Sequence, residues 1–479
     1  MLSKIQAIRT SVFQPLALLA VVALFASNQQ QVIAQKVPSA NLGNGVNFGA
    51  ILEAPYEGAW GLRVEPEFFE RVSEAGFGHI RLPVSWTYHA LTEAPYTVDP
   101  EFFGRIDEIL AMAQAIDVKL ILNDHHHEEL DTDPIGERER FLAIWDQIAT
   151  RYADRGDWLL FEILNEPHGQ FDIVPGLWNE IQQEALNVIR TTNPTRKVLI
   201  APLDFNSIAA LDQLEVPDDP NLIASVHYYS PFFFTHQGAP WVVPTPPTGV
   251  VWRPFYFSFA DPWINFSWNT KVESTGSGLR VTYQEAYAGF QVRHATPLTD
   301  AQAFQFRVNR PYRLQVILFD GDERIDYPIQ STATPGNEKL YTVNFDNLPD
   351  GFKVQNIAIQ NFDSDSQIPM IISVLRIKRN DEWSFIMTTQ TNIQRLHFRE
   401  ARDWAIANNI PLHLGEFGAA QFGNLEHRVN WTRSVRNTAE VLGIDWCYWE
   451  LAAENFGIYD PVNHVWRTDL RRALLPFSR

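Results

Sequence analysis

The feature that most constrains the fold is a repeated alternation of short apolar segments with amphipathic ones. Residues 43–49 (GNGVNFG) predict a strand, 66–76 (PEFFERVSEAG) a helix and 79–86 (HIRLPVSW) a second strand. The next helix is predicted over 99–116, where Asp99 can cap the first turn and Pro100 can occupy it. This order predicts parallel strands joined by helices.

The alternation runs through six predicted strands and, after a long interruption, through two more. The later strands are predicted near residues 119–124, 159–166, 197–202, 222–229, 411–417 and 444–450, each with a helix between it and the next. Eight such units predict a closed (β/α)₈ barrel. An open doubly wound sheet is the alternative, but the chain has no Gly-rich phosphate loop of the form G-x-G-x-x-G.

The interruption after the sixth strand predicts an inserted domain. Residues 239–254 (APWVVPTPPTGVVWRP) carry five prolines, which suit neither a helix nor a central strand. From 255 to 383 the sequence alternates and is rich in turns, as in SGLRVTYQEAYAGFQVRH. We therefore expect an all-β sandwich over 255–383, between two parts of the barrel at 35–254 and 384–479.

The N-terminus has the pattern of a secretory signal peptide. A basic start with Lys4 and Arg9 precedes an apolar run, and Ala34 is a plausible cleavage point, so residues 1–34 are predicted to be removed on export. An uncleaved membrane anchor is the alternative. Cys447 is the only cysteine, so a secreted form would have no internal disulfide. The formal charge of −19 argues against a nucleic-acid partner.

Polar residues cluster where the predicted strands end, which is where barrel enzymes place their sites. The most informative example is Asn165-Glu166-Pro167, because a proline pushes the residue before it toward extended dihedral angles, so Glu166 is predicted to sit as a fixed carboxylate at a strand tip. The other strand-terminal candidates are Asn47, Arg81, Asn123 to His127, His227 to Tyr229, Glu416, Trp449 and Glu450.

Glu166 and Glu416 end different strands of one ring, so both can face a central cleft. Two such carboxyl groups are what glycoside hydrolysis needs: one protonated to serve the leaving oxygen and one ionised. A gap near 5 Å gives retention of configuration, and roughly 6.5–9.5 Å gives inversion. The sequence leaves that choice open. Arg81 could keep a neighbouring carboxylate ionised, and Tyr229 could hydrogen-bond the nucleophile.

Two other side chains suit a sugar ligand, and one run of histidines suggests a different chemistry. Asn165 could hold a sugar hydroxyl, and Trp449 could stack on a sugar ring. His125, His126 and His127 could instead bind a metal, because alternate residues of a strand share a face. The chain has no H-E-x-x-H motif and no obvious third ligand, so we expect neither a metal nor a cofactor.

The chain resembles glycoside hydrolase family 5, a family of retaining cellulases and mannanases with (β/α)₈ barrels. The matching segments are GVNFGAILEAP, HIRLPVSW, LILNDHHHEEL, FEILNEPHG, VHYYSPFFFTHQGAPW, LHLGEFG and WCYWE. The resemblance implies that Glu166 is the acid/base and Glu416 the nucleophile. It further implies substrate-binding roles for Asn47, Arg81, His125, His126, Asn165, His227, Tyr229, His236, Trp241 and Trp449. His127 departs from the tyrosine expected after His-His.

The predicted insert loosely resembles carbohydrate-binding modules of secreted hydrolases. Trp252, Trp263, Trp268 and Trp383 are its candidates for sugar stacking, although most of them are expected to be core or interface residues. An insertion after strand six would emerge on the active face and could lengthen the cleft. The predicted function is therefore a secreted, retaining, endo-acting hydrolase of β-1,4-linked polysaccharide, with cellulose or β-glucan favoured and no protein partner evident. A β-mannanase, a xyloglucanase and a non-catalytic carbohydrate-binding barrel remain alternatives.

Overall fold

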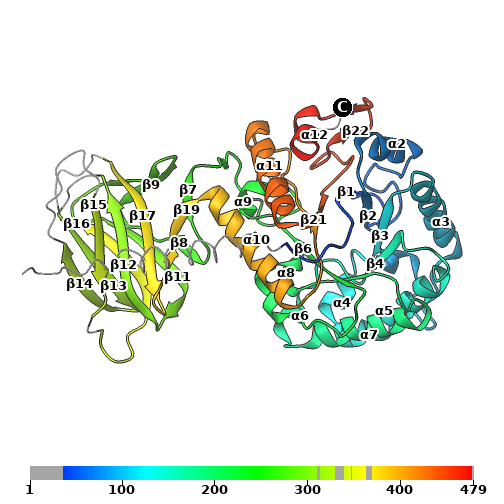
Figure 1. Cartoon of the computed structure of the whole chain (residues 1–479), viewed down its shortest axis with the longest axis horizontal. Coiled ribbons are helices and arrows are strands. Elements are labelled where there is room, and N and C mark those ends of the chain that lie inside the picture. Colours follow the sequence, from blue (N-terminus) through cyan, green and yellow to red (C-terminus); the bar gives the residue numbers. More distant parts are fainter. Residues whose placement is uncertain (1–35, 310–312, 330–338, 347, 363–368, 477–479) are drawn as a thin grey trace, which may run out of the picture.

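The structure is a computed structural model that describes residues 36–309, 313–329, 339–346, 348–362 and 369–476. The predicted signal peptide, residues 1–34, lies outside the described residues. Figure 1 shows two bodies side by side: a barrel surrounded by helices, and an all-β body of green and yellow strands. Among the described helices, none is long and apolar enough to cross a membrane.

The larger body is a closed parallel barrel, so the predicted (β/α)₈ fold is confirmed. Its strands follow the order β1-β2-β3-β4-β5-β6-β20-β21, and β21 pairs with β1 to close the ring. All neighbouring strands pair in parallel, as in Val46 beside Ile80. The strands are β1 (Asn44–Asn47), β2 (His79–Leu82), β3 (Lys119–Asn123), β4 (Leu159–Glu162), β5 (Val198–Ile200), β6 (Leu222–His227), β20 (Leu412–Glu416) and β21 (Asp445–Tyr448).

Local sequence signals set where the long helices begin and end. The side chain of Asp99 accepts a hydrogen bond from the backbone N–H of Glu101, and Pro100 is the first residue of its helix, as predicted. Gly76 ends another helix with a left-handed φ of 76°. The long helices are α2 (Pro66–Ala75), α3 (Pro100–Ala115), α5 (Pro134–Arg151), α7 (Leu177–Thr192), α10 (Gln390–Ala407), α11 (Leu425–Leu442) and α12 (Thr468–Leu474).

Shorter elements occupy the loops of the barrel. Several follow the carboxyl ends of strands and so stand around the mouth of the ring. They are η1 (Trp86–His89), α4 (Glu128–Thr132), α6 (Gln170–Ile173), α8 (Leu203–Asn206), η2 (Ile208–Gln213), α9 (Phe232–Thr235), β22 (Tyr459–Asp460) and β23 (Val465–Trp466).

The second body consists of two antiparallel sheets that share one hydrophobic cluster, with Phe290, Phe304, Phe306 and Ile359 among its members. One sheet has the order β15-β12-β17-β10-β9, with β18 paired to β17, and the other has the order β14-β13-β16-β11-β8. Their strands are β8 (Trp263–Asn265), β9 (Thr270–Thr275), β10 (Gly278–Tyr283), β11 (Gly289–Leu298), β12 (Ala301–Val308), β13 (Leu314–Asp320), β14 (Glu323–Ile329), β15 (Lys339–Asn344), β16 (Val354–Asn361), β17 (Met370–Arg379) and β18 (Glu382–Phe385).

The chain enters and leaves this body along a two-stranded ribbon. Strand β7 (Phe257–Phe259) pairs antiparallel with β19 (Met387–Thr389), so the two ends of the insert lie side by side. The insert therefore interrupts the barrel between β6 and β20 without separating the barrel's two parts. Residue 383, its predicted end, falls inside β18, and strand pairing continues to Thr389. The insert thus ends later than predicted.

The four tryptophans proposed for sugar stacking are mostly engaged within the protein. Trp252 is 1% exposed in the core of the barrel, and Trp263 is 4% exposed in the core of the insert, so neither ring can stack on a sugar. Both are therefore core residues, as expected for most of the four. Trp268 is half-buried against Gly289 and donates its indole N–H to the backbone of Tyr287. Trp383 lies beneath the guanidinium of Arg376.

Candidate active site

A cavity of about 1450 Å³ opens where the barrel strands end. Twelve side chains were assigned a catalytic or substrate-binding role from the sequence, and nine of them line this cavity. Residues far apart in the chain thus converge as predicted. These nine are His125, His126, Glu166, His227, Tyr229, His236, Trp241, Glu416 and Trp449. The other three, Asn47, Arg81 and Asn165, are buried behind this wall.

Glu166 is held in place differently from the prediction. Strand β4 ends at Glu162, so Glu166 lies in the loop beyond it, and its φ of 51° is left-handed rather than extended. Pro167 disfavours only the right-handed helical region for the residue before it. The left-handed region therefore stays available to Glu166 beside the extended one. The backbone N–H of Glu166 donates to Oδ1 of Asn206 at 2.9 Å, and this contact holds the turn. The expected extended conformation is therefore wrong, while the fixed carboxyl group remains.

Glu416, at the end of β20, is surrounded by hydrogen-bond donors. Nη1 of Arg81 donates to its Oε1 at 2.7 Å, and the hydroxyl of Tyr229 donates to its Oε2 at 2.8 Å. Gly415 makes room beside it, because a Cβ atom there would lie 3.0 Å from Nε2 of His227. These contacts favour the ionised form of the Glu416 carboxyl group.

Arg81 is fully buried and binds several groups at once. Its Nε donates to Oε2 of Glu162 at 2.6 Å, and its Nη2 donates to Oδ1 of Asn165 at 2.7 Å. Its Nη1 also donates to Oδ1 of Asn47 at 3.0 Å. Asn47 is 0% exposed and donates in turn to backbone carbonyl groups of Gly415 and Tyr448. The substrate-binding role predicted for Asn47 is corrected accordingly: it orients Arg81 and has no surface in the cavity.

The two candidate carboxyl groups lie close together in different environments. An oxygen of Glu166 and an oxygen of Glu416 are within 4.8 Å of each other. Burial raises the pKa of Glu166 to about 7, with the charge of Arg81 opposing that shift. Burial also raises the pKa of Glu416, against the opposing effects of His227, Arg81 and the Tyr229 hydroxyl. The donors on Glu416 favour ionisation there, so Glu166 is the group suited to retain a proton near neutral pH.

The histidines that line the cavity are held neutral by burial. Burial lowers the pKa of His227 to about 4 and that of His236 to about 4, and it holds the pKa of His125 well below its usual range. Nδ1 of His227 lies 2.7 Å from Oε1 of Glu166 in a hydrogen bond. A neutral imidazole there can orient the Glu166 carboxyl group without forming a second full charge beside Arg81.

The rings of His125, His126 and His127 point to different places and do not form a metal site. His125 stacks on Trp449 with ring centroids 5.5 Å apart, and His126 meets Trp60 edge to face. Nδ1 of His127 is 2.8 Å from Oδ2 of the buried Asp124. Although burial opposes it, Asp124 raises the pKa of His127 to about 9. His127 therefore belongs to a buried ion pair behind the site.

One other group among the described residues has the composition of a metal site, namely Glu166, His227 and Glu416. Arg81 already places a permanent positive charge 2.7 Å from Glu416, which competes with any metal ion for that carboxylate. Nδ1 of His227 is also engaged by Glu166. The donor set therefore suits an acid/base pair better than a bound cation.

Three buried acids near the site had no role predicted from the sequence. Glu162 binds Arg81, and the signal for it was a carboxylate inside the apolar run FEIL, which requires a buried cationic partner. Glu53 and Glu450 line the cavity. Burial raises the pKa of Glu53 to about 7, although the backbone N–H groups of Ala50 and Ile51 donate to it, and burial raises that of Glu450 well above its usual range. The sequence around Glu53 gave no such signal.

Aromatic rings provide flat surfaces along the cavity. Trp449 is half-buried, and Gly49 leaves room for its ring, since a Cβ atom at Gly49 would lie 2.8 Å from the ring. Trp60 and Trp241 are 53% and 47% exposed and also line the cavity. Trp241 packs beside Phe456, with ring centroids 6.0 Å apart. Such half-open rings suit the apolar faces of sugars.

The insert reaches the same cavity. Asp261 and Pro262, between β7 and β8, belong to its wall together with His397 and Glu400 of α10. Nε2 of His397 is 3.6 Å from Oδ2 of Asp261, and its Nδ1 is 3.1 Å from the hydroxyl of Tyr228. The all-β body thus contributes side chains to the candidate site and is joined to it through polar contacts.

A match to a family model shows which protein family this chain belongs to. The model of the cellulase family, glycosyl hydrolase family 5, matches residues 43–271 and 375–455, which is more than half of the chain. The chain belongs to glycosyl hydrolase family 5. The match passes over residues 272–374, which lie within the insert. The match therefore covers most of the barrel and the first and last strands of the insert.

Curated relatives in the family carry similar names. Endoglucanase H of Acetivibrio thermocellus is 39% identical over 196 residues, which are 41% of this chain and 22% of that protein. The cellulase/esterase CelE of the same organism is 32% identical over 209 residues, covering 40% of this chain and 26% of that protein. The chain thus spans only about a quarter of the length of these two relatives.

Solved structures of family 5 members resemble the fold. Cel5A of Thermotoga maritima in complex with cellobiose has a TM-score of 0.60 and 30% identity, covering 90% of this chain and 97% of that one. The same enzyme in complex with mannotriose has a TM-score of 0.60 and 29% identity over the same shares. Both are similar to this chain in the architecture of the barrel.

Proposed function

We propose that the chain is a retaining, endo-acting glycoside hydrolase of β-1,4-linked polysaccharide. The observation that carries the proposal is the placement of Glu166 and Glu416, with carboxyl oxygens within 4.8 Å of each other and with different hydrogen-bond partners. Retaining enzymes hold their two carboxyl groups about 5 to 5.5 Å apart, whereas inverting enzymes leave more room for water. The short gap therefore favours a covalent intermediate.

In the proposed mechanism each of the two groups has its own step. The carboxylate of Glu416 attacks the anomeric carbon while Glu166 gives its proton to the departing glycosidic oxygen, so the glycosidic bond breaks as the ester bond to Glu416 forms. Glu166, now ionised, then takes a proton from water, and that water displaces Glu416 from the sugar. Arg81 and Tyr229 stabilise the Glu416 carboxylate before attack and after release. Asn165, fixed by Arg81, can hold a sugar hydroxyl beside the reacting carbon.

Among the polymers, β-1,4-glucan is the favoured substrate. The endoglucanase names of the relatives support it, and so does the structure of Cel5A with cellobiose. The Cel5A structure with mannotriose keeps β-mannan as a second candidate, and xyloglucan is a third. The half-exposed rings of Trp60 and Trp241 suit a chain longer than one sugar unit, as expected of an endo-acting enzyme.

The test is reducing-sugar release from soluble β-glucan, xyloglucan and glucomannan by the wild type and by Glu166→Gln and Glu416→Gln. We expect hydrolysis of at least one polymer and loss of several orders of magnitude in both variants, because each removes one half of an acid/nucleophile pair. Val462→Ala, at a residue 83% exposed and outside the cavity, serves as the control. A wild type that binds these polymers without cleaving any would favour the non-catalytic barrel.

We also propose that the insert completes one end of the substrate cleft. Support comes from Asp261 and Pro262, which line the cavity together with residues of the barrel. The side chain of Asp261 is 72% exposed and can accept hydrogen bonds from sugar hydroxyls. A role of the insert as an independent carbohydrate-binding module has less support, because Trp263 is buried and Trp268 and Trp383 contact other residues of the insert.

Export is proposed from the sequence of the first 34 residues. The basic start and the apolar run of that segment support cleavage after Ala34. N-terminal sequencing of the protein recovered from a secreting host tests this proposal, and Gln35 is the expected first residue. Recovery in the membrane fraction with residues 1–34 intact would instead favour the anchor.

A further inference from the structure

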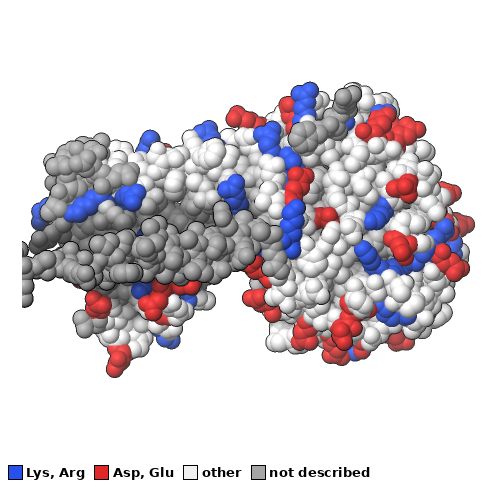
Figure 2. All heavy atoms as spheres, in the orientation of Figure 1, with Lys and Arg blue, Asp and Glu red and all other residues white. Residues whose placement is uncertain are grey.

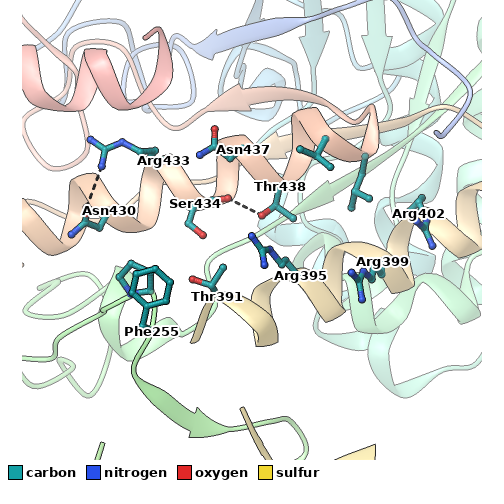
Figure 3. A pocket seen from close by; sticks show the side chains of 13 residues that line it. Phe255, Thr391, Arg395, Arg399, Arg402, Asn430, Arg433, Ser434, Asn437 and Thr438 are labelled. Atoms are coloured by element: carbon teal, nitrogen blue, oxygen red, sulfur yellow. Dashed lines mark hydrogen bonds between the residues drawn. The ribbon is translucent and has the colours of Figure 1, made fainter. Parts of the chain in front are cut away.

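A second cavity lies between helices α10 and α11 and shares no lining residue with the catalytic cavity. Its volume is about 450 Å³, and the segment Pro254-Phe255, which leads into the insert, borders it. Figure 3 shows Arg395 and Arg399 projecting from α10 into the space between the two helices. We call this cavity the arginine groove, after the four arginines that line it: Arg395, Arg399, Arg402 and Arg433.

The arginine groove carries positive charge without acidic residues in its lining, in a chain whose formal charge is −19. Figure 2 shows basic side chains gathered where α10 and α11 lie in Figure 1. Arg395, Arg399 and Arg433 are exposed, and within the described part of the chain none of them has a carboxylate within 4.0 Å. Arg402 pairs with Asp403. Mutual repulsion of these guanidinium groups favours binding of an anion.

The other lining residues indicate the chemistry of that anion. A guanidinium group binds a carboxylate through two parallel hydrogen bonds. The groove adds the amide of Asn437 and the hydroxyl of Ser434, which donates to Gln394 and can still accept from a sugar hydroxyl. The ring of Phe255, 74% exposed, can cover an apolar sugar face. Arg395 and Arg399 are four residues apart on one helix, about 6 Å along its axis. Repeated anions on a linear polymer can match that spacing.

We propose that the arginine groove binds an acidic polysaccharide through the carboxylates of its uronic acid units. This is a binding site separate from the catalytic cavity, and its function does not require hydrolysis of the bound polymer. The recessed shape between two helices suits a single chain better than a flat phospholipid surface.

The experiment is affinity electrophoresis of the full chain in gels containing polygalacturonate at low salt. We expect the wild type to be retarded, and the double variant Arg395→Gln/Arg399→Gln to bind at least about tenfold more weakly. The double variant Arg280→Gln/Arg472→Gln removes the same charge at exposed positions outside the groove and should bind within about twofold of the wild type. Hydrolysis of neutral β-glucan and the unfolding temperature should be unchanged in both double variants.

Three results would overturn the proposal. The first is a wild type that polygalacturonate does not retard. The second is equal weakening by the groove variant and by the control variant, which would indicate a general effect of charge. The third is binding to vesicles that contain phosphatidylglycerol but not to polygalacturonate, which would make a phospholipid the ligand. Because polygalacturonate binding is measured without catalysis, loss of the proposed hydrolytic function would not produce any of these results.

Discussion

The guanidinium group of Arg81 bridges two buried carboxylates, with Nε 2.6 Å from Oε2 of Glu162 and Nη1 2.7 Å from Oε1 of Glu416. The positive charge of Arg81 thus contacts both Glu162 inside β4 and the proposed nucleophile at the end of β20. Since Glu162 has no exposed surface, the Arg81 guanidinium is the charged partner that offsets the burial of its side chain. The position of Glu416 is therefore coupled to the stability of the barrel interior.

Replacing Arg81 by lysine should damage both activity and stability. A single ammonium group cannot make the separate contacts that Nε and the two terminal nitrogens make, so at least one carboxylate stays buried without its partner. We expect kcat/KM to fall by about 100-fold or more and the free energy of unfolding to fall by about 3 kcal/mol. Steady-state kinetics and denaturant unfolding measure the two effects. If Arg81→Lys unfolds with the same free energy as the wild type, Arg81 does not stabilise the two carboxylates as described.

The pH dependence of kcat/KM should report the two glutamates. Because Glu166 must carry a proton and its pKa is raised to about 7, the rate should fall as the pH rises through about 7. The Tyr229 hydroxyl lowers the pKa of Glu416, so Tyr229→Phe should raise that pKa and move the acid limb to higher pH. The exposed Tyr56 offers a control in Tyr56→Phe. An acid limb that stays in place would show that Tyr229 does not act on Glu416.

The ion pair of His127 and Asp124 should make stability depend on pH. The pKa of His127 is raised to about 9 in the folded state, above the value near 6.5 of an unfolded chain. The stabilisation is therefore complete below about pH 6.5 and is lost as the pH rises through about 9. We expect the unfolding temperature of the wild type to drop over this range more than that of His127→Asn. Parallel curves for the two proteins would contradict the pairing.

Removal of the Asp261 carboxylate should affect long substrates more than short ones. If the insert completes one end of the cleft, Asp261→Ala should raise KM for long oligosaccharides about fivefold, the loss of roughly one hydrogen bond, and leave the shortest cleaved substrate unaffected. The matched control is Asp322→Ala, an exposed residue between β13 and β14 of the insert. An equal change in KM for every chain length would indicate that Asp261 does not contact the polymer.

The barrel could be predicted from the sequence because each unit carries its own signals. Asp99 and Pro100 begin a helix as their chemistry requires, and the apolar strands close into a ring in the expected order. The ribbon of β7 and β19 was not predicted, because each strand has only three residues and carries no pattern that identifies its partner across the insert. The insert's extension to Thr389 therefore became visible only in the structure.

The sequence predicted which residues form the candidate site better than it predicted how they are arranged. Positions at or just beyond the ends of the barrel strands were enough to bring Glu166, Glu416 and His227 together. It could not distinguish Asn47, whose side chain is turned away from the cavity toward Arg81, nor the left-handed turn at Glu166. Those details depend on contacts between neighbouring strands and loops, such as that of Asn206 with the backbone of Glu166.

The measurement that tests the central claim most directly is the anomeric configuration of the first product. Proton NMR can follow the wild type cleaving cellopentaose, or the matching oligosaccharide of whichever polymer proves to be the substrate, before the sugar equilibrates in solution. With Glu416 as nucleophile and Glu166 as acid/base within 4.8 Å of it, the β-anomer should accumulate first and the α-anomer only later. Initial formation of the α-anomer would contradict the covalent mechanism.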